Sequence, residues 1–123
     1  MNLYQAKEVT KMLLEFKCSN HRSIKEKVSF SMIAGSDNTS EELLKKFGNF
    51  RILRSAVIYG ANGSGKSNFI SALSFMKDLV SNSINHQPGQ GVFQARHKLS
   101  AEETPSEYSI QFVRNDIRYA LSL

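Results

Sequence analysis

The chain has 123 residues, of which 41% are hydrophobic and 22% are charged, a composition that is usual for one globular domain. It has no run of about 18 apolar residues, which excludes an ordinary transmembrane helix, and its first residues are too polar for a signal peptide. The only cysteine, Cys18, cannot form an internal disulfide. We therefore expect a soluble, cytoplasmic protein in which Cys18 is an inert thiol.

The net charge of +5 is placed unevenly along the chain. Residues 1–67 contain 11 Lys/Arg and 6 Asp/Glu, whereas residues 68–123 contain 5 of each. A local positive field suits a polyanion, either nucleotide phosphates or a nucleic acid, although a small surplus also serves solubility alone. Nucleic-acid binding therefore stays an open alternative.

The N-terminal third of the chain is typical of a β-hairpin. Residues 1–11 are polar and form a lead segment that is frayed or a short helix, ahead of the domain proper at residues 12–123. Residues 12–18 (MLLEFKC) are mostly apolar, and residues 28–33 (VSFSMI) alternate with a period of two. A polar turn separates them, so the two segments are expected to pair.

The next segment carries helix signals. Ser40 is a plausible N-cap, and two acidic residues follow it, where the helix dipole favours negative charge. The spacing predicts a short helix that carries Leu43, Leu44 and Phe47 and ends at Gly48.

The central part of the sequence predicts a strand, a glycine-rich loop and a helix, in this order. Residues 52–59 (ILRSAVIY) predict a strand, and the apolar run AVIY at its end favours burial on both faces. The loop GANGSGKS follows at 60–67. Apolar residues then recur at helical spacing and predict a helix over 66–82; they are Phe69, Leu73, Met76 and Val80.

The last third is expected to be a long loop over 83–105 and a hairpin over 106–123. The loop is rich in polar residues and glycine, and its length suggests a function or a missing partner. Alternating apolar residues form the two hairpin strands, and Asn115-Asp116 suits a two-residue turn.

The loop at 60–67 satisfies the pattern G-x-x-x-x-G-K-[ST], and it lies between a predicted strand and a predicted helix as that motif requires. Its glycines let the backbone adopt positive φ and let phosphate oxygens approach the peptide N–H groups. Lys66 can reach the β- and γ-phosphates, and Ser67 can offer a hydroxyl ligand to Mg²⁺. The alternative is a turn that merely joins strand to helix, with Lys66 in solvent.

The motif predicts binding of a nucleoside triphosphate with Mg²⁺, and ATP rather than GTP because no N-K-x-D motif is present. Asn62 could contact the γ-phosphate or the attacking water. The expected nucleotide-binding residues are Gly60, Ala61, Asn62, Gly63, Ser64, Gly65, Lys66, Ser67 and Asn68.

Three segments together resemble a known family: MLLEFKCSNHRSIKEKVSFSM, AVIYGANGSGKSNFISAL and EYSIQFVRNDIRYALSL. They are similar to the N-terminal part of an AAA-15-type (abortive-infection, RloA-like) ATPase, within the RecF, SMC and OLD group of ABC-like P-loop ATPases. The resemblance covers nearly the whole chain from Met12. It implies an α/β fold, namely a partial P-loop lobe with an antiparallel β-subdomain, and a role in phage defence or DNA repair.

The same resemblance bears on the turn after the first strand, where the group has N-[FY]-R-[SN]. Asn20, Arg22 and Ser23 match this pattern, and His21 replaces the usual aromatic residue. The resemblance implies that this turn lies near the nucleotide, with Arg22 and Asn20 as further candidate binding residues. The alternative is a solvated basic turn.

Two elements of an ABC-like ATPase do not occur in the sequence. No strand of four apolar residues ends in Asp-Glu, as the Walker B strand does, and Leu99-Ser100 is followed by Ala-Glu rather than by a signature loop. Three glutamines are candidates for the one that senses Mg²⁺, and the sequence does not choose between them: Gln87, Gln90 and Gln94. Since phosphoryl transfer depends on the groups that the Walker B strand and the signature loop supply, we expect this chain alone to hydrolyse little ATP.

Other reactive residues suggest no second site. His21, His86 and His97 are too scattered for a metal centre, and we expect them at the surface. The favoured hypothesis is thus that the chain is the Walker A part of an ATPase. This ATPase would act as a homodimer or with a second chain that supplies the other motifs. On this hypothesis, we interpret the length of the chain as that of an N-terminal fragment. The alternatives are a non-catalytic nucleotide-binding or interaction module and, less favoured, a small kinase.

Overall fold

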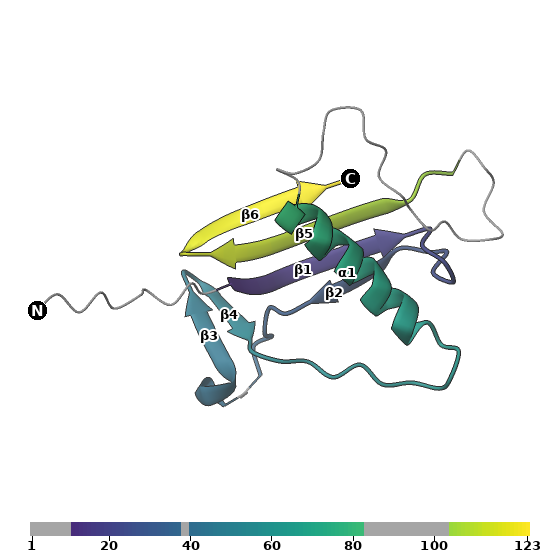
Figure 1. Ribbon diagram of the computed structural model, residues 1–123. Coiled ribbons are helices and arrows are strands. Elements are labelled where there is room, and N and C mark those ends of the chain that lie inside the picture. Colours follow the sequence, from purple (N-terminus) through teal and green to yellow (C-terminus); the bar gives the residue numbers. More distant parts are fainter. Residues whose placement is uncertain (1–10, 38–39, 83–103) are drawn as a thin grey trace, which may run out of the picture.

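The computed structural model describes residues 11–37, 40–82 and 104–123. Its main element is a four-stranded sheet in the order β2-β1-β5-β6, in which every neighbouring pair is antiparallel. The strands are β1 (Lys11–Ser19), β2 (Val28–Ser31), β5 (Glu107–Arg114) and β6 (Ile117–Ser122). Figure 1 shows the single described helix, α1 (Lys66–Asn82), lying across one face of this sheet. Both predicted hairpins are thereby confirmed.

A β-bulge in β1 changes which of its residues face α1. The register with β5 shifts between Leu13 and Glu15, so that Leu13 and Phe16, three positions apart, face α1 whereas Leu14 faces the other way. The extra residue of a bulge resets the alternation of the strand in this way. Because side chains alternate between the two faces, the sheet has an apolar core on each side.

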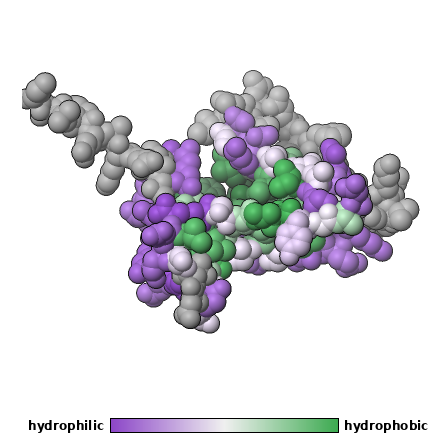
Figure 2. All heavy atoms as spheres, turned by 90° about the horizontal axis from the view of Figure 1, so that it is seen from below, coloured by the Kyte–Doolittle hydropathy of each residue, from purple (hydrophilic) through white to green (hydrophobic). Residues whose placement is uncertain are grey.

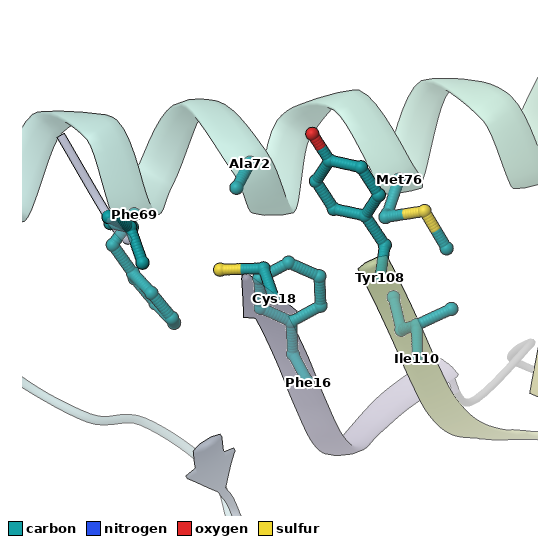
Figure 3. Packing of buried hydrophobic residues seen from close by; sticks show 8 residues of the cluster. Phe16, Cys18, Phe69, Ala72, Met76, Tyr108 and Ile110 are labelled. Atoms are coloured by element: carbon teal, nitrogen blue, oxygen red, sulfur yellow. The ribbon is translucent and has the colours of Figure 1, made fainter. Parts of the chain in front are cut away.

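The larger core lies between α1 and the sheet (Figure 3). Phe69, Ala72 and Met76 point from the helix toward β1 and β5, and all three are buried. The ring of Phe69 meets that of Phe16 edge to face, with centroids 5.6 Å apart. The predicted helix over 66–82 is confirmed, and this packing fixes the end of the glycine-rich loop against the sheet.

The smaller core corrects the prediction of a helix over residues 40–48. Only a 3₁₀ turn at Glu41–Leu43 forms, and Ser40 makes no side-chain cap. The chain instead forms a second hairpin, β3 (Leu44–Phe47) and β4 (Phe50–Leu53), with Gly48 at φ +53° in its turn. Ile52 is buried against Leu14 and Val113 of the main sheet, and this tertiary burial outweighs the local helix signals.

The strand predicted over residues 52–59 is confirmed only at its first two residues. It ends at Leu53, and residues 55–59 form no backbone hydrogen bond with any described residue. Val57 and Tyr59 are 84% and 89% exposed. A strand needs a neighbour to pair with, and the described parts of the chain place none beside this segment. The α/β expectation therefore holds in its coarse form, because helix and sheet are both present, whereas the strands that the structure describes pair only antiparallel and do not confirm a P-loop lobe.

Several expectations fall on residues that the structure does not describe. They are the lead segment except Lys11, most of the loop 83–105, and the three candidate glutamines with His86 and His97. Within the described ranges, no helix has the length and apolarity needed to cross a membrane.

Candidate functional site

The glycine-rich loop forms a tight curl between the extended segment 55–59 and helix α1. Gly63 and Gly65 adopt φ values of +80° and +93°, which only glycine adopts without strain. The Ser64 amide donates to the Ala61 carbonyl at 3.2 Å, and the Phe69 amide donates to the Gly65 carbonyl at 2.9 Å. The second bond begins the helix, so the loop ends where the free amides of α1 start.

Lys66 closes this curl with its ammonium group. Its Nζ donates to the carbonyl oxygens of Gly60 and Ala61, each at 2.7 Å, and lies 3.4 Å from the Ser64 hydroxyl. A Cβ on Gly60 would lie 2.9 Å from that hydroxyl, so a larger residue there would require the Ser64 side chain to shift. The loop thus holds a positive charge at its centre, next to the N-terminus of α1. This arrangement can attract and bind an anion.

The other predicted binding residues lie along the same loop. Ala61, Asn62, Gly63 and Ser67 are exposed, and Asn68 is half-buried in the first turn of α1. Ser67 follows Lys66 directly, in the first turn of α1. These residues are accessible to a ligand, and their roles in binding remain predictions.

The turn after β1 lies against the loop through Ser23. The Asn68 side-chain amide donates to the Ser23 hydroxyl at 2.6 Å, and that hydroxyl lies 3.5 Å from where a Cβ on Gly65 would be. Arg22 is exposed on the same turn. Asn20 is buried, and its amide donates to the Thr104 carbonyl at 2.8 Å, so this side chain serves the fold.

His21 is buried rather than exposed, which corrects the expectation of a surface histidine. Its Nδ1 lies 2.8 Å from the Tyr108 hydroxyl, and its Nε2 lies 3.4 Å from the Ser71 hydroxyl of α1. Burial, reinforced by the charge of Arg22, lowers the pKa of His21 below its usual 6.5. The neutral imidazole therefore links the turn to both the sheet and the helix, and no periodicity in the sequence indicated it.

An apolar cavity of about 410 Å³ opens beside the loop. Figure 2 shows apolar side chains gathered near the middle of the face seen from below. Ile24, Phe30 and Phe69 line the cavity on one side, and Lys66 lines it with Tyr59 on the other. Its volume is within the range of small-molecule sites. A larger cavity of about 510 Å³ lies at Lys17, Lys27 and the ends of β5 and β6, and none of residues 60–67 lines it.

The residues at the loop fit Mg²⁺ only as a partner of phosphates. Among the described residues, no group of three His, Cys, Asp or Glu side chains could hold a metal ion. Mg²⁺ is usually bound through one or two protein ligands together with substrate phosphates and water. The Ser67 hydroxyl can supply one such ligand, so the donor set suits a metal that arrives with a nucleotide.

Comparison with known proteins identifies the family. A sequence profile described as "AAA domain, putative AbiEii toxin, Type IV TA system" matches residues 55–122, which is more than half of the chain and contains the loop, α1, β5 and β6. Neither the curated proteins nor the solved structures gave a match. The chain belongs to this AAA domain family, which indicates a nucleotide-binding, ATPase-like function.

Proposed function

We propose that the chain binds Mg-ATP at Gly60–Ser67, which serves as the Walker A loop of an ATPase. The observation that carries this proposal is the position of the Lys66 ammonium, held by two carbonyls at the centre of the loop and next to the start of α1. A β- or γ-phosphate at this place would meet the lysine charge, the loop amides and the helix dipole together. Few other ligands would interact favourably with the lysine charge, the loop amides and the helix dipole at once.

The cavity beside the loop supports a nucleoside triphosphate over a simple phosphate. It is continuous with the loop because Gly60, Gly65 and Lys66 line both. Its remaining walls are mostly apolar and partly aromatic, which suits stacking of a base. The triphosphate would lie along Gly60–Ser67, and the nucleoside would enter the cavity.

Hydrolysis needs groups beyond this loop. A carboxylate must hold Mg²⁺ and orient water, and further charge must stabilise the transferred phosphoryl group. We propose that a second copy of the chain or another subunit supplies them. The segment 55–59 supports this proposal, since it is exposed, makes no backbone hydrogen bond with a described residue, and carries apolar side chains that favour contact with another strand. The same observation favours the alternative of a non-catalytic nucleotide-binding module that pairs with another subunit.

The finer classification rests on the turn and the loop together. The N-H-R-S sequence at Asn20–Ser23 and the hydrogen bond of Ser23 with Asn68 at the start of α1 support membership of the RecF, SMC and OLD group of ABC-like ATPases. On that basis we propose a role in phage defence or DNA repair. The surplus of basic residues before position 68 would suit contact with a nucleic acid.

Calorimetric titration with Mg-ATP tests the binding proposal. Lys66→Ala should abolish most of the affinity, because the charge at the centre of the loop is lost. Lys77→Ala is the matched control, since it removes an exposed lysine of the same helix. Equal affinities of wild type and Lys66→Ala would overturn the proposal.

A separate assay distinguishes the ATPase from the non-catalytic module. We expect no phosphate release from the purified chain at low concentration. A rate of phosphate release per chain that rises with protein concentration would support a dimeric ATPase. No phosphate release at any concentration would favour the non-catalytic module.

A further inference from the structure

The hydroxyl of Ser23 occupies an unusual place for a residue on a turn between two strands. Ser23 is 42 positions before Gly65 in the sequence, yet its Oγ lies 3.5 Å from the point where a side chain on Gly65 would begin. It is exposed, so a ligand in the loop can reach it. The turn that carries it is fixed to the fold by the side-chain hydrogen bonds of Asn20 and His21, the residues just before Arg22.

The hydrogen bonding of Ser23 leaves its proton available. Asn68 donates to the Ser23 oxygen at 2.6 Å, so the oxygen already accepts a bond. Among the described residues, no acceptor takes the Ser23 proton. A hydroxyl can accept and donate at once. The bond from Asn68 therefore orients a donor that has no acceptor within residues 11–37, 40–82 and 104–123.

We propose that Ser23 donates this proton to a phosphate oxygen of the bound nucleotide and that Asn68 is its positioning residue. Because Gly65 has no Cβ on the side that faces Ser23 Oγ, a phosphate oxygen can approach the Gly65 backbone from this side and meet the Ser23 hydroxyl there. The phosphate site would thus be built from two segments of the chain rather than from the loop alone. This inference rests on the proposed binding of a triphosphate at Gly60–Ser67.

The geometry assigns this role to Ser23 rather than to its neighbours. The amide of Asn20 is already used within the fold. Arg22 lies on the turn with φ +52° and is exposed, but the contacts with Asn68 and the approach to Gly65 are made by Ser23. Binding should therefore depend on a hydroxyl at position 23 more than on the charge at position 22.

The test compares Ser23→Ala, Ser23→Thr and Asn68→Ala, with Ser74→Ala as the control at an exposed serine of α1. Affinities for Mg-ATP and for inorganic tripolyphosphate are measured by calorimetry, and thermal unfolding reports the fold. A hydrogen bond to a charged group contributes about 1.5–3 kcal/mol, so Ser23→Ala should raise both dissociation constants by roughly 10-fold or more. Ser23→Thr should keep most of the affinity, and Ser74→Ala should have no effect.

A double-mutant cycle tests the role of Asn68. Asn68→Ala should weaken binding in the wild type but have little further effect when Ser23 is already alanine. An undiminished effect in the Ser23→Ala background would overturn the positioning role. Normal affinity of Ser23→Ala, with affinity lost in Lys66→Ala, would overturn the role of Ser23 while leaving the proposed function intact. Normal affinity of both Ser23→Ala and Lys66→Ala would instead reject the triphosphate site itself.

Discussion

Substitution of Gly65 by alanine should damage both the fold and the binding site. An L-residue at φ +93° carries strain of about 1–3 kcal/mol, which should appear as a lower free energy of unfolding. The new Cβ would lie in ordinary contact with Ser23 Oγ, so no clash adds to this strain. The same Cβ would block the side of residue 65 from which a phosphate oxygen is proposed to approach. Loss of about two charge-assisted hydrogen bonds, at roughly 1.5 kcal/mol each, would raise the dissociation constant for Mg-ATP about 100-fold.

Gly35→Ala is the matched control for this substitution. Gly35 does not have a positive φ, and a Cβ there would meet nothing within 4 Å. Urea denaturation gives the free energy of unfolding, and calorimetry gives the affinity for Mg-ATP. The reasoning would be refuted if Gly65→Ala changed both quantities no more than Gly35→Ala does.

Three further predictions concern the fold around the site. Because the pKa of His21 is lowered, the free energy of unfolding should be constant above about pH 7 and fall as the pH decreases below 6.5. His21→Phe should remove this pH dependence, as measured by urea denaturation, and an unchanged pH profile in this variant would contradict the prediction. Met76→Ala should cost about 2–5 kcal/mol by the same method, because Met76 is fully buried between α1 and the sheet; a loss below about 1 kcal/mol would contradict this packing. Val57→Ser should change the stability of the monomer by less than about 0.5 kcal/mol, since Val57 is unpacked, and a larger loss would show that the segment is paired.

Local patterns predicted the elements whose partners are close in the chain or whose periodicity is strong. The turn at Asn115-Asp116 joins β5 to β6 as expected, with both residues at positive φ. The helix over 66–82 also follows its apolar spacing. The loop at 60–67 could be located because its glycines and lysine occur at a fixed spacing between the elements that the motif requires.

The errors arose where distant contacts decide the structure. Residues 44–53 form a hairpin because Ile52 packs on Leu14 and Val113, and no local signal reveals that surface. Residues 56–59 look like a buried strand from composition, but burial requires neighbours that composition does not supply. The burial of His21 depends on Tyr108, a residue 87 positions away.

The most direct test of the account is a map of the Mg-ATP site by NMR. Backbone amide signals of the isotope-labelled chain are followed during titration with Mg-ATP. The account predicts that the largest shifts occur at Gly60–Ser67, with a second group at Ser23 on the neighbouring turn. Shifts confined to the cavity near Lys27 and Ser106, or no saturable shifts at all, would contradict binding of a nucleotide at the glycine-rich loop.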